Sequence, residues 1–233
     1  YQKKLVGMQK ISKKISFAKS YERWESEFGS EKHDAYISSH KYYEDVLAEL
    51  LILQGGVCAY SELQLINQSN LNELKNNFNS GKLQSNALRK FRLPIDLEHF
   101  DSRLKTDFGW KWSNFFAVYN LINQKDKRNE EDKLLKKGLH VDTILKSDLE
   151  SYDPIELLDY DYDLNLFLPN KELSNEDFER VKVMITCLGL NNAFVKMNRE
   201  NYYNELNNRI ALGENPQLYQ FFTGWEIMKN KKN

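Results

Sequence analysis

Two short β-prone segments followed by a charged helical segment are the strongest constraint on how this chain of 233 residues can fold. Residues 93–100 (LPIDLEHF) alternate apolar and acidic side chains, a pattern typical of a half-buried strand that enters a turn. Residues 115–119 (FFAVY) are a second short strand candidate, and residues 120–138 are strongly charged with a helical pattern that ends at a glycine. This order predicts a hairpin followed directly by a helix.

The rest of the chain has mainly helical patterns, so we predict an α+β fold that is predominantly helical. Residues 32–54 carry apolar side chains at helical spacing and stop at a glycine pair, whereas residues 67–87 are polar and indicate a loop with one short helix at most. Three further helices are expected at 174–187, where SNED resembles a capping box, from about 191 to 212, and from Pro216 onward.

The composition limits the class of protein. Hydrophobic residues make up 41% of the chain, which is enough for a packed core, and 33 basic residues balance 34 acidic ones, which excludes a uniformly basic nucleic-acid-binding coat. No apolar stretch approaches the length of a membrane span, so we expect no membrane partner. Cys58 and Cys187 form no CxxC pair and indicate no disulfide framework, so we expect a cytoplasmic protein.

We expect one compact domain built from three consecutive regions. Residues 1–54 are predicted to form a basic arm and a helix, and residues 55–135 hold the hairpin and the charged helix. Residues 136–233 are predicted to form an acidic crossover and C-terminal helices that pack on the middle region.

The adjacent pair Glu98-His99 (DLEHF) suggests the chemistry of a metal-dependent phosphodiester nuclease. Such an enzyme needs a general base and a divalent cation at the scissile phosphate, and Mg²⁺ prefers oxygen ligands and keeps several waters. We predict His99 as the base and Glu98 and Asn123 as protein ligands of Mg²⁺ or Mn²⁺. On a regular strand Glu98 would point away from His99, so this assignment needs a bend there, and Asp96 and Asn120 are the alternative ligands.

Two further groups of residues complete the predicted site. Asn114, in the loop before the second strand, is expected to anchor either that loop or the imidazole ring. Lys125, Lys127 and Arg128, on the charged helix, are expected to contact the DNA backbone. The competing interpretation is that His99 is an ordinary buried imidazole and that the three basic residues form a solvated helix face paired with nearby acids.

The ordered motifs resemble the HNH nuclease family, whose ββα-metal finger has a carboxylate-His pair, then Asn, then a final His or Asn. GGVCAYSE at 55–62, EHFDSR at 98–103 and WSNF at 112–115 are similar to the HNH proteins linked to retrons and to Septu-type phage-defence systems. The resemblance implies a DNA endonuclease in antiviral defence, often beside an ATPase partner. It also implies a phosphate contact for Arg103, which stands where that subfamily has Lys.

One departure from this subfamily is large. Its members typically hold a structural zinc with two CxxC pairs, and the matching positions here are Cys58, Ser61, Tyr119 and Ile122. One thiol cannot make a tetrahedral zinc site, so we expect no structural zinc while the catalytic Mg²⁺ or Mn²⁺ is retained. Two alternatives stay open. The chain is either a catalytically inactive HNH-fold adaptor that binds a partner protein or nucleic acid, or an unrelated helical protein with a chance match.

Overall fold

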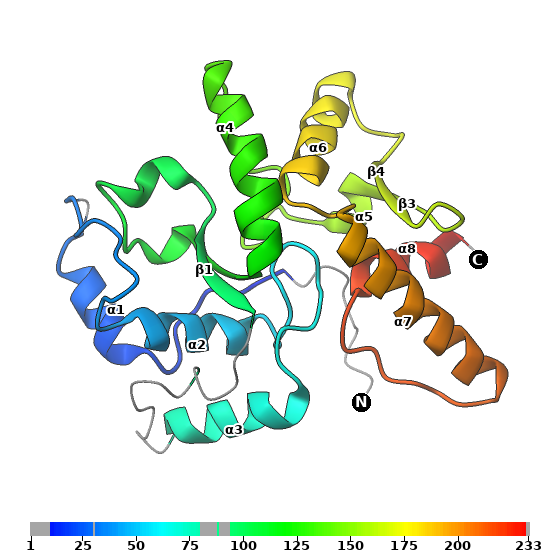
Figure 1. The fold of residues 1–233 in the computed structure, drawn as a ribbon, viewed down its shortest axis with the longest axis horizontal. Coiled ribbons are helices and arrows are strands. Elements are labelled where there is room, and N and C mark those ends of the chain that lie inside the picture. The colour runs from blue at the N-terminus through cyan, green and yellow to red at the C-terminus, as the bar shows by residue number, and fades with distance from the viewer. Residues whose placement is uncertain (1–9, 30, 80–87, 89–93, 232–233) are drawn as a thin grey trace. The chain divides into compact units, whose positions relative to one another are not determined.

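The structure, a computed structural model, describes residues 10–29, 31–79, 88 and 94–231. Helices dominate these residues, together with two small antiparallel sheets, which confirms the α+β prediction (Figure 1). The chain divides into two compact units. Of the described residues, the first unit, here called the N-terminal unit, comprises those within 11–59 and 64–120, and the C-terminal unit comprises residue 10 and those within 60–63 and 121–231. The boundary after residue 120 falls inside the predicted 55–135 region.

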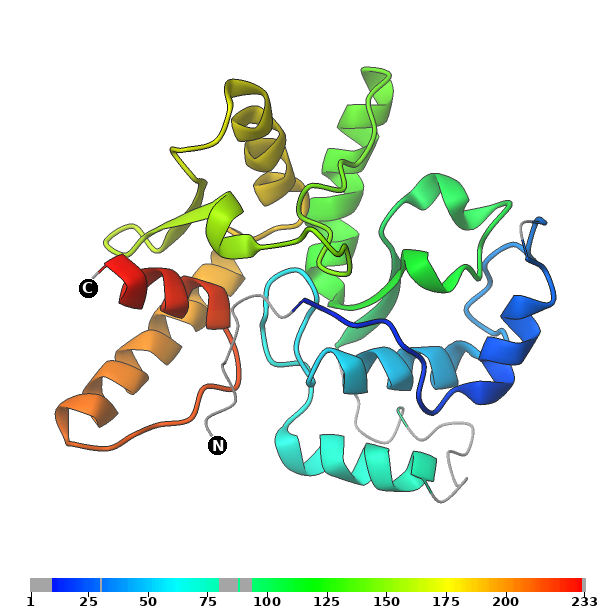
Figure 2. The same ribbon diagram turned by 180° about the vertical axis from the view of Figure 1, so that it is seen from behind.

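The N-terminal unit contains three α-helices, α1 (Lys19–Ser26), α2 (Tyr43–Leu53) and α3 (Gln68–Asn79), among its described residues. Helix α2 buries most of its side chains, and α3 lies beside it in both views (Figures 1 and 2). The helix predicted from residue 32 begins later, at Tyr43, because the backbone N–H groups of His33 and Tyr36 donate to carbonyls of the segment after residue 99 instead. The loop predicted at 67–87 contains the longer helix α3, and its residues 80–87 lie outside the described residues.

The predicted hairpin strands are present. Strand β1 (Ile95–His99) pairs antiparallel with β2 (Phe115–Tyr119), from Ile95↔Tyr119 to His99↔Phe115. All five residues of β2 are buried, and two 3₁₀ turns, Ser102–Lys105 and Trp112–Asn114, occupy the connection. The buried Gln54 side chain fixes α2 to β2, because its amide donates to the Ala117 carbonyl at 2.7 Å and accepts from the Ala117 N–H at 2.9 Å.

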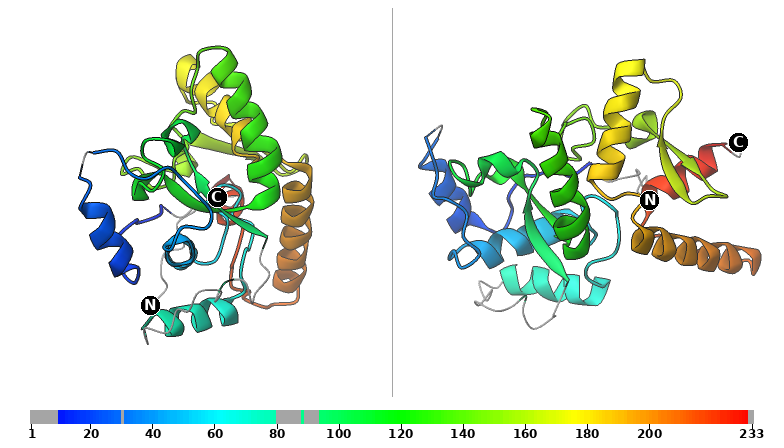
Figure 3. Two further views of the ribbon diagram at one scale, coloured as in Figure 1. Left: turned by 60° about the vertical axis from the view of Figure 1, so that its left-hand side comes forward. Right: turned by 45° about the horizontal axis from the view of Figure 1, so that its top comes forward.

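The long segment of the C-terminal unit opens with a π-helical stretch, η4 (Ile122–Lys127), that continues into α4 (Arg128–Lys136), as the charged pattern predicts. Helix α6 (Asn175–Cys187) lies beside α4 (Figures 1 and 3), and α7 (Ala193–Ala211) follows it. The remaining elements are α5 (Pro154–Leu157), the antiparallel strands β3 (Leu158–Asp161) and β4 (Leu166–Pro169), and α8 (Phe222–Lys231).

Of three helix starts predicted in the C-terminal unit, two agree with the structure and one does not. Ser174 Oγ accepts from the Asp177 N–H at 3.1 Å and Asn192 caps α7, which confirms both predicted starts. The prediction that Pro216 opens the last helix was wrong, because α8 begins at Phe222. Among the described residues, none of the helices has the length and apolar character that crossing a bilayer would require.

Candidate catalytic site around His99

Strand β1 stays regular through His99, so the bend that the sequence interpretation required is absent. The ladder pairs Glu98 with Phe116 and His99 with Phe115 in register. Successive side chains on a strand point to opposite faces, so Glu98 shares its face with Asp96, and His99 lies on the other face. Both side chains are buried, with 3% of Glu98 and 0% of His99 exposed to solvent.

The imidazole of His99 is held by a backbone carbonyl and by aromatic rings. Its Nε2 lies 2.8 Å from the Gly109 carbonyl oxygen, and the ring centroids of Tyr36 and Phe115 lie 4.5 Å and 4.8 Å away. A carbonyl oxygen can only accept, so Nε2 carries the proton in this contact. In the neutral imidazole, Nδ1 is then the atom that can take up a proton.

Sequence reasoning missed two tyrosines near His99. Tyr36 forms an edge-to-face contact with the imidazole, and its hydroxyl hydrogen bonds to that of Tyr43, which also accepts from the backbone N–H of Leu97. Burial is the main cause that raises the pKa of both phenols, so both stay neutral in the ordinary pH range. No spacing rule links residue 36 to residue 99, so the local sequence pattern holds no signal for this contact.

Asn114 locks the chain directly after β1. Its Oδ1 accepts from the Asp101 N–H at 2.9 Å, its Nδ2 donates to the Asp101 carbonyl at 2.9 Å, and its own carbonyl accepts from the Phe100 N–H at 2.7 Å. Asn114 was expected to anchor either the loop or the imidazole of His99. Its side chain anchors the loop, and the Gly109 carbonyl holds the imidazole. Arg103 forms an ion pair with Asp101 at 2.6 Å and remains largely exposed.

The other predicted site residues belong to the C-terminal unit. Asn123 is half-buried in η4, and Lys125 and Arg128 are exposed. Lys127 requires a correction, because only 1% of its side chain is exposed and its ammonium pairs with the Glu131 carboxylate at 2.9 Å. As placed, Lys127 supports the helix and does not offer its charge to a phosphate.

The positions that match the subfamily's zinc ligands are all buried, namely Cys58, Ser61, Tyr119 and Ile122. Within the N-terminal unit, Cys58 Sγ accepts from the Tyr119 N–H at 3.4 Å. Two positions that the resemblance assigns to different CxxC pairs therefore lie together, although sixty residues separate them in the chain. A buried thiol that accepts a backbone hydrogen bond occupies this place.

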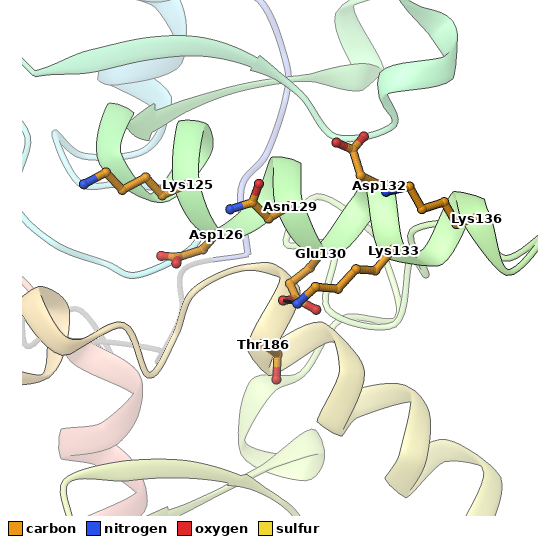
Figure 4. A pocket seen from close by; sticks show the side chains of 8 residues that line it. All are labelled: Lys125, Asp126, Asn129, Glu130, Asp132, Lys133, Lys136 and Thr186. Atoms are coloured by element: carbon orange, nitrogen blue, oxygen red, sulfur yellow. Dashed lines mark hydrogen bonds and ion pairs between the residues drawn. The ribbon is translucent and has the colours of Figure 1, made fainter.

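A polar groove of about 360 Å³ runs along α4 in the C-terminal unit and is closed on one side by Thr186 of α6 (Figure 4). Glu130 pairs with Lys133 at 2.5 Å, and Asp126 accepts from the Asn192 amide at 2.6 Å. Three lysines face three carboxylates here, so the groove has no excess positive charge that would attract a polyanion. The remaining lining residues are Lys125, Asn129, Asp132 and Lys136.

Among the described residues, no group of three or more His, Cys, Asp or Glu side chains is placed to hold a metal ion. The predicted ligand set has one carboxylate, Glu98, and one amide, Asn123, so this finding does not bear on it. Carboxylate and amide oxygens are donors that suit Mg²⁺ and Mn²⁺. Comparison with protein-family models gives no match, and comparison with curated proteins gives no similar sequence.

Proposed function

We propose that this chain is a metal-dependent HNH-type endonuclease that hydrolyses DNA phosphodiester bonds, with β1, β2 and the η4–α4 segment as its ββα-metal finger. Two features support the assignment. The chain order of the hairpin and helix matches that finger, and Cys58 lies beside Tyr119 as the subfamily's zinc knuckle would require. The same resemblance extends the proposal to phage defence with an ATPase partner.

The hydrogen bond between His99 Nε2 and the Gly109 carbonyl is the observation that carries the proposal. It fixes the ring orientation and leaves Nδ1 as the basic nitrogen, which a general base requires. Two hydrogen bonds join the Asn114 side chain to the backbone of Asp101, and these residues stand at the two ends of the connection between β1 and β2. The strand end that carries the imidazole is therefore rigidly supported.

Glu98 and His99 point to opposite faces of β1, so both side chains would act on one phosphate only if the chain bends at the end of this strand. When bound, a divalent cation would stabilise charge on the phosphate and the leaving oxygen. Glu98 and Asn123 would hold it, and Lys125, Arg128 and Arg103 would contact the DNA backbone.

Cleavage of supercoiled plasmid DNA with Mn²⁺ or Mg²⁺ tests the proposal. Wild-type protein should nick or linearise the plasmid, His99→Ala should abolish cleavage, and excess chelator should abolish it without a large fall in melting temperature. His140→Ala is the matched control, because His140 is exposed in the C-terminal unit and has no role in the proposed site. Equal cleavage by wild type and His99→Ala would refute the catalytic assignment.

A catalytically inactive adaptor is the second candidate, and the burial of His99 and Lys127 favours it. A base with no exposed surface cannot meet water without a rearrangement, and a buried lysine cannot contact phosphate. This candidate predicts that folded wild-type protein cleaves no DNA or RNA with either metal, while it still binds a partner protein or nucleic acid.

A further inference from the structure

The segment between α1 and α2 passes directly over His99. Residues 31–42, here called the strap, form turns and extended chain without a regular helix or strand. A general base must reach water, yet 0% of His99 is exposed. The strap supplies part of the cover, because the Tyr36 ring lies edge-to-face with the imidazole at 4.5 Å and stacks on Trp110 at 5.5 Å.

Short-range polar contacts tie the strap to the loop after β1. The His33 N–H donates to the Asp107 carbonyl at 2.8 Å, and the Tyr36 N–H donates to the Lys105 carbonyl at 3.0 Å. An exposed ion pair joins Lys32 to Asp107 at 2.9 Å, and exposed pairs of this kind contribute little stability. Aromatic packing adds to these contacts, since the His33 ring lies 4.9 Å from that of Phe28 and the His40 ring 4.1 Å from that of Trp110. Most strap residues are exposed, and an exposed segment without regular secondary structure opens at a lower free energy than core strands.

The hydrogen bonds that orient His99 and the loop after β1 come from outside the strap, although the Tyr36 ring of the strap also packs on the imidazole. The Gly109 carbonyl holds Nε2, and Asn114 holds Asp101, and none of these residues belongs to residues 31–42. Strand β1 is held by its pairing with β2. Lifting the strap would therefore uncover the imidazole while both partners of its hydrogen bond, His99 and Gly109, stay outside the moving segment.

We propose that the strap is a cover on the candidate site, with Tyr36 as its closing residue, and that it must lift before His99 can meet water or a phosphate. The role of the cover in controlling a nuclease rests on the proposed function, but the cover itself can be tested without measuring DNA cleavage. The strap then keeps the nuclease inactive in its resting state, and Tyr36 acts by covering the base rather than by taking part in the reaction.

Labelling with diethyl pyrocarbonate, read at each histidine by mass spectrometry, tests the cover. His99 should react much more slowly than the exposed His140 in wild-type protein. Tyr36→Ala should raise His99 labelling on the order of tenfold, equivalent to ~1.4 kcal/mol less opening free energy. The control Tyr162→Ala removes a tyrosine that is 50% exposed in the C-terminal unit and should leave His99 labelling unchanged. Unchanged labelling in Tyr36→Ala, or wild-type labelling equal to that of His140, would overturn the inference.

Hydrogen exchange of wild-type protein gives a second test that does not depend on a variant folding. The amides of His33 and Tyr36 should exchange well before the paired amides of β1 and β2, and equal protection would overturn the inference. Cleavage assays separate the two proposals. Increased His99 labelling in Tyr36→Ala, with no DNA cleavage by any variant, would support the cover and refute the nuclease. DNA cleavage by wild type, with unchanged His99 labelling in Tyr36→Ala, would support the nuclease and refute the cover.

Discussion

Glu62 provides the sharpest quantitative prediction, because it is a fully buried carboxylate that holds the start of a helix. Its Oε2 accepts from the Thr223 N–H at 2.9 Å and its Oε1 accepts from the Thr223 hydroxyl at 2.8 Å, at the first turn of α8. Burial raises the pKa of Glu62 to about 7, although the hydrogen bonds from Thr223 and the charge of Arg199 lower it. The folded protein therefore protonates Glu62 in a range where the unfolded chain does not.

The direction of the pH effect follows from proton binding. Between the ordinary pKa of 4.5 and about 7, the folded state binds more protons at Glu62 than the unfolded state. The contribution of Glu62 to the free energy of unfolding should therefore be largest below about pH 4.5. It should fall as the pH rises through about 7. At about 1.4 kcal/mol per pKa unit, the full loss is roughly 3 kcal/mol.

The perturbation is Glu62→Gln, which keeps the shape and an oxygen acceptor for the Thr223 N–H but cannot ionise. Urea unfolding from pH 5 to pH 8, followed by circular dichroism, should show the variant gaining roughly 2.5 kcal/mol relative to wild type across this range. Nuclear magnetic resonance titration of the Glu62 carboxyl carbon checks the pKa directly. Parallel stability curves for the two proteins would refute the reasoning.

Three other substitutions have expected outcomes that urea unfolding measures. Asn114→Ala should cost about 2 kcal/mol, because two backbone groups of Asp101 lose their partner. Gly109→Ala should cost more than about 3 kcal/mol, because a Cβ there would overlap backbone atoms of residues 34–36 and 105, and a loss below 1 kcal/mol would contradict this packing. Lys127→Met should cost roughly 3 kcal/mol by removing the buried partner of Glu131, and adding Glu131→Leu should recover most of it.

Local sequence patterns predicted the elements whose stabilising contacts are local. Alternating side chains indicated β1, the short segment FFAVY indicated β2, and the capping box SNED indicated the start of α6. The candidate site was only partly accessible to such reasoning. The pattern identified Glu98, His99 and Asn114, but the carbonyl of Gly109 and the ring of Tyr36 reach His99 through tertiary folding. Burial of Lys127 was also hidden, because a charged helix pattern does not reveal which lysine faces the interior.

Two remote glutamates explain why the starts of α1 and α8 escaped prediction. The carboxylate of Glu49, buried in α2, accepts from the N–H groups of residues 16–18 at 2.7 to 2.9 Å, just before α1 begins. Glu62 binds within the first turn of α8, where its carboxylate accepts from the N–H and the hydroxyl of Thr223. A helix start normally needs a nearby side-chain acceptor for its free N–H groups, so a sequence search looks for Ser, Thr, Asp or Asn within a few residues. Here the acceptors come from distant segments, which lets a short helix begin without a local signal and couples each helix to the core that carries its glutamate.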